Sequence, residues 1–432
     1  MNGLRPGTIF ALSSGPPPAG IGVVRISGPA AASALTALAG ILPVSRRATL
    51  RRLADPVSHQ PLDHALVLWF PGPATATGED LAELHLHGGR AVIAAVLAAL
   101  ETLPALRPAE PGEFTRRAFE TGRIDLSEAE GLADLLAAET EAERINALRL
   151  AEGGLSSQVA AWQRATLDLA ARVEALIDFS DEDDVGEGDP AGLRAGCAAL
   201  AGTIGIVRDA PPAERLRDGI RVVLGGPTNA GKSTLLNALA GRDAALVSPI
   251  AGTTRDVIEA PVSLGGLPLL LIDTAGLRHD AGEPIEAMGI ARAGRTIAAS
   301  DILLWLGAPD DCPEPERSII VHARADQHPD MVAGADIAVS AVTGMGMDTL
   351  RGLVLSRARS LLPRPDALAI NVRQRAAVAE AAAMLGEAAT QSDWLLVAEH
   401  LRLALAAFDR LTGRAGTEDM LDALFGRFCI GK

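Results

Sequence analysis

The stretch Ile220-Arg221-Val222-Val223-Leu224-Gly225-Gly226-Pro227-Thr228-Asn229-Ala230-Gly231-Lys232-Ser233 decides the fold of the middle of this 432-residue chain. An apolar run of strand length leads directly into G-x-x-x-x-G-K-S, and an apolar helical run follows the motif. In this context the motif forms a phosphate-binding loop, whose glycines let backbone N–H groups wrap phosphate oxygens. The start of the following helix adds partial positive charge.

Further short apolar runs, separated by helix-length segments, follow the motif. This spacing is typical of a mostly parallel sheet in an α/β domain, which we expect over residues 217–360. The strands are predicted from the runs at residues 269–272, 302–306, 319–321 and 337–339.

The flanks of this region differ from it. Residues 121–216 and 361–432 have apolar residues at helical spacing, and we expect them to pack together as one all-α domain interrupted by the α/β insertion. Ser127 and Glu130 resemble a capping box at the start of the first helix. Residues 1–120 mix strand-like and helical runs, which predicts a separate α+β domain. The expected fold is therefore multidomain, with domains at 1–120, 121–216 plus 361–432, and 217–360.

The charge distribution limits the function. The net charge is −15, from 54 acidic and 39 basic residues, and residues 121–216 alone hold 19 acidic against 8 basic. A freestanding protein that holds nucleic acid by non-specific phosphate attraction is therefore excluded. Three cysteines cannot build a disulfide framework, and no apolar run reaches the about 18 residues that span a bilayer. We expect a cytoplasmic protein with no membrane partner.

Lysine is almost absent from the chain. There are 37 arginines but only two lysines, Lys232 and Lys432. Because arginine is the background choice, each remaining lysine marks a place where a compact ammonium is required.

The residues after the phosphate loop indicate a GTPase. Asp273 begins D-x-x-G directly after a predicted strand, and Thr254 lies 22 residues beyond Lys232. In GTPases these positions face the γ-phosphate, where Lys232 would reach the β- and γ-phosphates and Ser233 and Thr254 would ligate Mg²⁺. A Ras-like glutamine after D-x-x-G is replaced here by Leu277.

The base-reading motif departs from the usual N-K-x-D. The chain has Ala323-Arg324-Ala325-Asp326, which keeps the carboxylate that accepts from guanine N1–H and the exocyclic amine. Ala323 removes one polar contact, so GTP is favoured over ATP but weaker binding or specificity is expected. The predicted GTP-binding residues are Asn229, Ala230, Gly231, Lys232, Ser233, Thr234, Ser248, Pro249, Ile250, Ala251, Gly252, Thr253, Thr254, Asp273, Thr274, Ala275, Gly276, Asp326, Ser340 and Ala341.

Several segments resemble one family along nearly the whole chain. The chain ends in Cys429-Ile430-Gly431-Lys432, a C-x-G-K ending that is highly specific, and it is similar to the MnmE (TrmE) family of tRNA-modification GTPases. The other segments that carry the resemblance are residues 20–28, 68–73, 77–80, 87–89 and 111–119.

The resemblance implies a tetrahydrofolate-binding-like, dimerising N-terminal domain and a potassium-activated GTPase. Glu286 matches the family's water-positioning glutamate, while an extra residue before it keeps Glu283 as a weaker candidate. The implied K⁺ ligands are Asn229, Ser248, Ile250 and Thr253, and the implied folate contacts are Arg25, Glu83, Arg123 and Lys432. Arg123 stands where the family usually has lysine.

The resemblance also implies a reaction and a partner. In a heterotetramer with the FAD-containing protein MnmG (GidA), the family forms an aminomethyl or carboxymethylaminomethyl group at C5 of the wobble uridine of certain tRNAs. The one-carbon donor is 5,10-methylenetetrahydrofolate, of which 5-formyltetrahydrofolate is an analogue. Cys429 is either a nucleophile in this chemistry or a structural part of the C-terminal hook. Two alternatives stay open: a ribosome-assembly switch GTPase, and a paralogue whose GTP hydrolysis is weakened by Ala323 and Arg324.

Overall fold

The chain forms two compact units in the computed structural model, residues 1–133 with 412–432 and residues 134–411. Residues 121–133 and 412–432, expected in the helical domain, thus belong to the first unit, and the division into three domains stays a prediction. The structure describes residues 7–178, 189–241, 245–246, 258–274, 293–364, 367–414, 418–426 and 428–431.

The first unit is built on a six-stranded sheet of order β3-β4-β5-β2-β1-β6. Neighbouring strands are antiparallel except for the parallel pair β1 and β6. The strands are β1 (Thr8–Leu12), β2 (Ile21–Ser27), β3 (Thr49–Ala54), β4 (Pro61–Phe70), β5 (Leu81–His87) and β6 (Leu106–Pro108).

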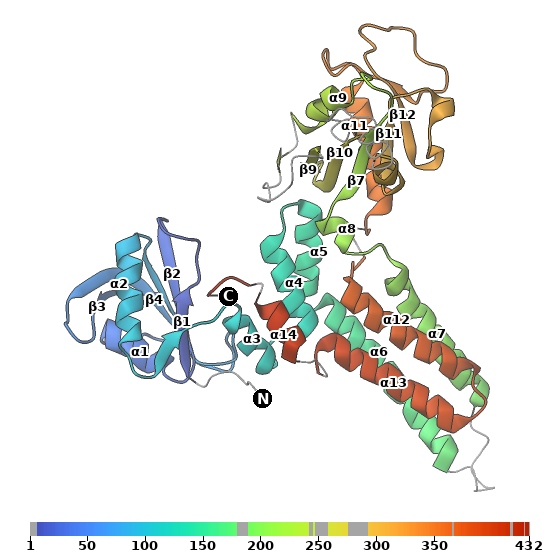
Figure 1. Ribbon diagram of the computed structural model, residues 1–432. Coiled ribbons are helices and arrows are strands. Elements are labelled where there is room, and N and C mark those ends of the chain that lie inside the picture. The colour runs from blue at the N-terminus through green and yellow to red at the C-terminus, as the bar shows by residue number, and fades with distance from the viewer. Residues whose placement is uncertain are drawn as a thin grey trace, which may run out of the picture. The chain divides into compact units, whose positions relative to one another are not determined.

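Helices α1 (Ala31–Ala39) and α2 (Arg90–Glu101) cover one face of this sheet (Figure 1). Val24 and Ile26 of β2 point into that face and are fully buried, as the period of two along a strand requires. The α+β prediction for this part is confirmed. Strand β3 was not predicted, because it is an edge strand and its exposed Leu50 disrupts the alternation of buried apolar and exposed polar residues.

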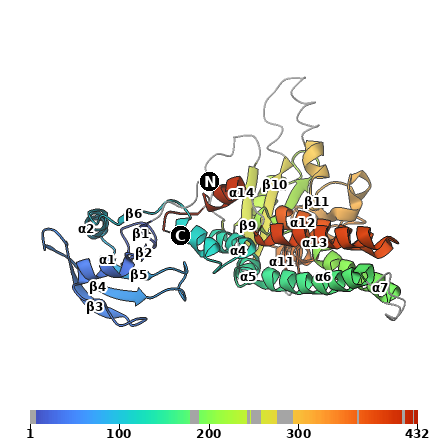
Figure 2. The same cartoon turned by 90° about the horizontal axis from the view of Figure 1, so that it is seen from below.

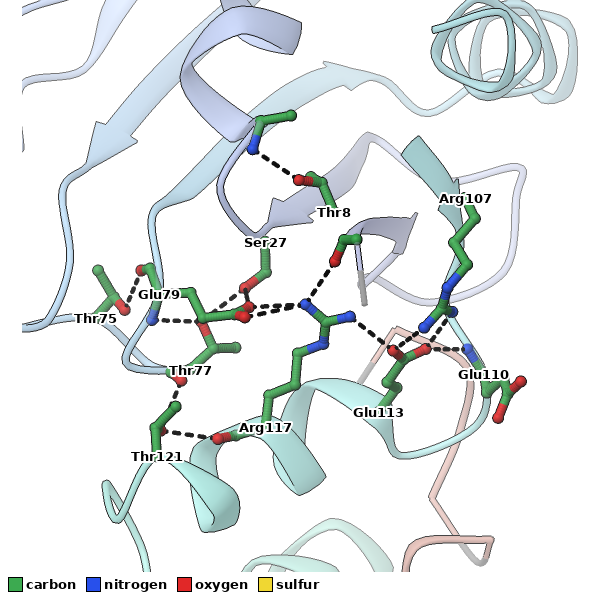
Figure 3. A network of polar contacts seen from close by, with 12 residues as sticks. Thr8, Ser27, Thr75, Thr77, Glu79, Arg107, Glu110, Glu113, Arg117 and Thr121 are labelled. Atoms are coloured by element: carbon green, nitrogen blue, oxygen red, sulfur yellow. Dashed lines mark hydrogen bonds and ion pairs between the residues drawn. The ribbon is translucent and has the colours of Figure 1, made fainter. Parts of the chain in front are cut away.

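A buried ion network ties helix α3 (Glu113–Glu120) to the sheet (Figure 3). Arg117 donates to Glu113 at 2.9 Å and to Glu79 at 3.0 Å, and Arg107 donates to the other Glu113 oxygen at 2.8 Å. The Glu113 and Arg117 side chains are only 3% and 4% exposed. Burial alone would raise the pKa of Glu113, but hydrogen bonds from Arg107, the Glu110 N–H and Arg117 hold that pKa below its usual value.

The C-terminal residues fold onto the first unit after helix α14 (Glu418–Phe425). Ile430 forms an antiparallel bridge with Pro111, and the Ser13 hydroxyl donates to the Gly431 carbonyl at 2.8 Å. Gly431 has φ of +96°, and a Cβ there would overlap the Leu12 carbonyl. Only glycine fits this close approach, which explains one position of the terminal motif.

The first helix after residue 120 begins differently from the prediction. In α4 (Leu126–Ala137) the reciprocal capping bonds join Asp125 and Glu128, at 2.9 and 2.6 Å. The predicted box of Ser127 and Glu130 is therefore wrong, because Ser127 lies inside the helix and is buried. Helix α4 ends at Ala137, and α5 (Glu141–Ala151) follows it, capped by the Thr140 side chain, which accepts from the Glu143 N–H.

Long helices from distant parts of the sequence form a bundle in the second unit. The helices of the bundle run alongside one another (Figures 1 and 2). Trp162 and Phe408 pack in its core, with ring centroids 6.1 Å apart. The bundle consists of α6 (Gly154–Asp178), α7 (Pro190–Asp209), α12 (Val372–Thr390) and α13 (Trp394–Thr412). The helical segments before and after the α/β region thus pack together, as the fold class required.

One segment, Pro190–Arg217, is long and apolar enough to cross a membrane by length and composition alone. A core helix of a soluble protein passes the same test. Here Leu193, Cys197 and Ile204 are buried in the bundle core, while Ile206 is 75% exposed and only 22% of the apolar window is buried.

The second unit also contains a seven-stranded sheet of order β13-β12-β11-β7-β10-β9-β8. The five strands from β13 to β10 are parallel, which confirms the predicted α/β core, and the antiparallel β9 and β8 were missed. The strands are β7 (Ile220–Gly225), β8 (Ala245–Leu246), β9 (Ile258–Leu264), β10 (Leu267–Asp273), β11 (Ile302–Trp305), β12 (Ser318–His322) and β13 (Ile337–Ala338).

Helices complete this α/β region. Leu236 from α9 (Lys232–Ala240) and Leu350 from α11 (Met347–Leu361) are buried against Val222 and Leu224 of β7. The remaining short elements are α8 (Glu214–Arg217), η2 (Pro309–Asp311) and η3 (Pro315–Arg317).

The ion network predicts a specific loss of stability. Glu113→Gln leaves Arg107 and Arg117 with less compensating charge, and we expect the free energy of unfolding of the first unit to fall by about 3 kcal/mol. Because the pKa of Glu113 is lowered, this stabilisation is present above the ordinary carboxyl value of 4.5 and is lost as pH falls through the folded-state pKa.

Urea unfolding of the full chain and hydrogen exchange of the α3 amides measure the effect. The matched control is Glu101→Gln, an exposed position on α2, which we expect to change stability by less than about 0.5 kcal/mol. Equal effects of the two substitutions would show that the network contributes no net stability.

Candidate functional site

The phosphate loop connects the end of β7 to the start of α9. Gly226 and Gly231 have φ of +137° and +95°, and a Cβ at Gly226 would lie 3.0 Å from the Leu306 backbone. Asn229, with φ of +60°, occupies the left-handed region that asparagine tolerates best among residues with side chains. The loop backbone therefore depends on the residue types that the motif specifies.

Lys232 is held inside this loop. Its side chain is buried, and its ammonium donates to the Gly226 carbonyl at 3.0 Å and to the Pro227 carbonyl at 2.7 Å. A compact group with three donors fits this position, whereas a planar guanidinium is longer and wider. The geometry explains why an arginine-rich chain has lysine here.

Asp273 meets Ser233 at the end of the sheet. Strands β10 and β7 are parallel neighbours with Asp273 opposite Leu224, so both strands end at the same edge. The Ser233 hydroxyl donates to the Asp273 carboxylate at 2.5 Å, and Asp273 is only 1% exposed. The hydroxyl of Thr274, the residue after Asp273, donates to the Leu224 carbonyl at 2.7 Å and so ties the end of β10 to β7. A hydroxyl beside a buried carboxylate offers the oxygen ligands that Mg²⁺ prefers.

A cavity of about 240 Å³ lies beside the phosphate loop. Three segments meet there: the start of α9, the loop after β12 and the loop after β13. Its lining residues are Gly231, Thr234, Leu235, Ala323, Arg324, Asp326, Gln327, Val339, Ala341 and Val342. The structure therefore places Asp326 and Ala341, two of the residues predicted to bind GTP, next to the phosphate loop.

Two further predicted residues help to shape this region. Ser340 is fully buried, and its hydroxyl accepts from the Thr343 N–H at 3.2 Å, so its side chain stabilises the loop that carries Ala341. Ala230 packs against the hydrophobic core under the phosphate loop.

Part of the predicted site lies outside the described residues. These are Ser248, Pro249, Ile250, Ala251, Gly252, Thr253, Thr254, Ala275, Gly276, Glu283, Glu286 and Lys432.

The predicted folate contacts in the first unit include a strand-to-strand ion pair. Arg25 of β2 lies opposite Glu83 of β5 and donates to it at 2.9 Å through Nη2 and 3.2 Å through Nε. Sequence reasoning missed His85, whose Nε2 lies 3.3 Å from Glu83, and Phe114, whose ring centre lies 5.8 Å from the Arg25 guanidinium. His85 follows Glu83 by two on one strand face, which was the available signal.

The other residues predicted near folate have few described contacts. Arg123 follows α3, its N–H donates to the Ala118 carbonyl at 2.8 Å, and its side chain approaches Gly78. Cys429 is exposed and precedes Ile430 of the bridge to Pro111. Within the described residues no group of three or more His, Cys, Asp or Glu side chains is arranged to hold a metal ion.

A glycine-shaped phosphate loop, a buried lysine and a serine paired with a carboxylate define the class of this protein, a P-loop nucleotide-binding protein. Two family models match the chain, the GTP-binding protein TrmE N-terminus over residues 8–123 and the MnmE helical domain over residues 126–429. The chain belongs to the MnmE (TrmE) family of tRNA-modification GTPases. It is accordingly a GTP hydrolase that acts in tRNA modification, with GTP and Mg²⁺ at its G domain.

Relatives match along their whole length. The tRNA modification GTPase MnmE of Rhizorhabdus wittichii is 62% identical over 427 residues, which cover 98% of this chain and 96% of the relative. That of Novosphingobium aromaticivorans is 55% identical, with coverage of 98% and 99%. The solved G domain of the Thermotoga maritima FeoB iron transporter is 23% identical and covers 32% of this chain and 98% of its own, with a TM-score of 0.24. A match this weak adds nothing to the assignment.

Because two carbonyl contacts fix the Lys232 ammonium, we expect that a positive charge of another shape at this position does not preserve nucleotide affinity. In Lys232→Arg the guanidinium cannot reproduce the two carbonyl contacts and the phosphate contact together, so we expect nucleotide affinity to fall by about tenfold or more. Titration with a fluorescent GDP analogue measures this affinity. Arg359→Lys, an exposed exchange in α11, is the control, and unchanged affinity in Lys232→Arg would contradict the explanation.

Proposed function

We propose that this chain is a K⁺-dependent GTPase that forms the aminomethyl or carboxymethylaminomethyl group at C5 of the wobble uridine of certain tRNAs. It acts with the FAD-containing protein MnmG and uses 5,10-methylenetetrahydrofolate as one-carbon donor. The observation that carries the proposal is the end-to-end identity to tRNA modification GTPases, on a chain whose phosphate site is assembled.

We assign the GTP contacts to the residues predicted from sequence. Lys232 and the loop N–H groups hold the phosphates. Asp326 accepts from N1–H and the exocyclic amine of guanine, and Ala341 lies beside the base. The buried Asp273 and the Ser233 hydroxyl support a Mg²⁺ site that Thr254 completes. When bound, the metal stabilises charge on the phosphates, while the protein's residues orient them.

Hydrolysis needs a group that orients water. Because Leu277 stands in the place of the Ras-like glutamine, we assign that role to Glu286, with Glu283 as the weaker candidate. A carboxylate there would hold the attacking water and leave charge stabilisation to the cations and the phosphate loop.

Asn229 supports a potassium site. It is exposed in the phosphate loop at positive φ, and within the described residues its side chain has no hydrogen-bond partner, which leaves the carboxamide oxygen for a cation. Ser248, Ile250 and Thr253 would supply the other oxygens. A K⁺ ion there would supply the charge that an arginine finger supplies elsewhere.

The first unit supports folate binding. Glu83 offers acceptors and Arg25 donors on neighbouring strands, with side chains 18% and 26% exposed, which fits a ligand with an aminopyrimidine ring and carboxylates. Arg123 and Lys432 are the further proposed contacts. Cys429, being exposed, is open to a role as nucleophile, and its place in the C-terminal bridge equally suits a structural role.

We further propose a homodimer through the N-terminal domain, a heterotetramer with MnmG and a cytoplasmic location. The three-domain division at 1–120, 121–216 plus 361–432, and 217–360 belongs to this proposal. A paralogue with weakened hydrolysis is the second candidate, because Ala323 and Arg324 replace two residues of the base motif.

Potassium dependence is tested by hydrolysis rates in KCl and NaCl at equal ionic strength. We expect rates at least about tenfold lower in NaCl, since a positive charge at this place is worth about 10³ or more in related GTPases. Equal rates would eliminate the potassium mechanism. Glu286→Gln should abolish hydrolysis and spare GTP binding; if Glu283→Gln does so instead, the assignment across the one-residue insertion is wrong.

The modification role is tested in a strain that lacks the gene. Nucleoside analysis of its tRNA should show loss of the C5 substituent, restored by the chain itself and not by Arg25→Gln. Calorimetry with 5-formyltetrahydrofolate should show weaker binding to Arg25→Gln but not to the exposed Arg90→Gln. If the wobble uridine keeps its C5 substituent in the deletion strain, the modification role is refuted. Equal affinity of Arg25→Gln and Arg90→Gln for 5-formyltetrahydrofolate would refute the folate assignment.

A further inference from the structure

Two opposite charges line the cavity beside the phosphate loop without pairing. Asp326 and Arg324 both line it, two residues apart in one loop. Within the part of the chain that the structure describes, neither the Asp326 carboxylate nor the Arg324 guanidinium has a hydrogen-bond or ion-pair partner. Each is therefore available to a ligand that enters the cavity.

The loop that carries them is fixed by its backbone. Arg324 has φ of +56°, and its carbonyl accepts from the N–H groups of Gln327 at 2.9 Å and His328 at 3.0 Å. Between the two charges, Ala325 is buried, and its N–H donates to the Val339 carbonyl at 3.1 Å. The side chains at 324 and 326 thus project from a preformed turn.

Arg324 lies across the phosphate loop. A Cβ at Gly231 would lie 3.6 Å from Nε of Arg324 and 3.9 Å from its Cγ, which is ordinary contact distance. A planar guanidinium and its stem in this position can cover the face of a flat ring, and such stacking is insensitive to the groups on the ring edge. Arg324 is therefore suited to hold any purine.

The cavity wall next to Arg324 has no side-chain hydrogen-bond donor at position 323. Ala323 lines the cavity and packs against the hydrophobic core, so a methyl group stands where N-K-x-D has an amide. Guanine presents the acceptors O6 and N7 on one edge and the donors N1–H and the 2-amino group on another. A carboxylate accepts only, so Asp326 can read only the donor edge.

We propose that no side chain of this chain reads N7 of the base: Asp326 discriminates through N1–H and the 2-amino group, Arg324 adds affinity that is independent of the base, and Ala323 offers N7 no donor. The proposal rests on the proposed role of Asp326 as the guanine contact. The nucleotide specificity of this GTPase therefore differs from that of a G domain with an intact motif.

Competition of nucleoside diphosphates against a fluorescent GDP analogue on the full chain tests the proposal. We expect 7-deaza-GDP, which lacks the N7 acceptor, to bind within about twofold of GDP, because no side chain donates a hydrogen bond to N7. IDP and XDP, which alter the 2-amino group, should bind about tenfold or more weakly. A 7-deaza-GDP penalty of tenfold overturns the proposal. If IDP and XDP match GDP, the assignment of Asp326 itself fails, which is a different outcome.

Three substitutions separate the residues. Ala323→Asn supplies the absent amide and should create a 7-deaza-GDP penalty of about fivefold or more. Arg324→Ala should weaken GDP, IDP and XDP by the same factor, and a changed ratio among them would contradict its base-independent role. Asp326→Asn, which offers a donor, should favour XDP over GDP. Arg359→Ala in α11 is the matched control for loss of an exposed arginine, and we expect it to bind all of them as the unchanged chain does.

Discussion

The parallel pairing of β10 with β7 is the constraint on which the nucleotide site depends. Its register sets Asp273 opposite Leu224, directly before the phosphate loop, and so brings a buried carboxylate to the Ser233 hydroxyl. A slip of one residue would turn the Asp273 side chain to the other face of the sheet and separate this pair. The buried residues of β7 lie in a separate core cluster on each face of the sheet, and this packing on both sides opposes such a slip.

The parts of the fold that sequence could predict are those with strong local signals. The central strands carry continuous apolar runs, and the phosphate loop carries glycines at positions that require positive φ, so both were predicted from residue type alone. Strands β3 and β9 were missed because one is an exposed edge and the other contains Pro261. The helix cap moved from Ser127 to Asp125 because tertiary packing buries Ser127.

The site divides in the same way. Motif spacing named Lys232, Ser233 and Asp273, since each acts through a chemistry that only a few residue types provide. It gave no sign of the contact of Phe114 with Arg25, because that contact comes from a helix that follows much later in the chain, whereas the contact of His85 with Glu83 could have been inferred from their spacing of two on one strand. Long-range placement of ordinary residues leaves no mark in a local pattern.

The contrast between the two lysines and the many arginines gains a physical meaning from the cavity. At Lys232 the ammonium donates to two carbonyls of the loop, an arrangement that suits a compact cation. At Arg324 the side chain lies on an open surface over Gly231, where a planar group covers more of a ring than an ammonium does. Of these two cations, the one enclosed by carbonyl groups is lysine and the exposed one is arginine, whereas the enclosed Arg117 is matched by carboxylates that suit its planar guanidinium. In the proposed arrangement, Ala323 leaves N7 without a side-chain donor, while Asp326 still accepts from the donor edge and Arg324 covers the face of the base.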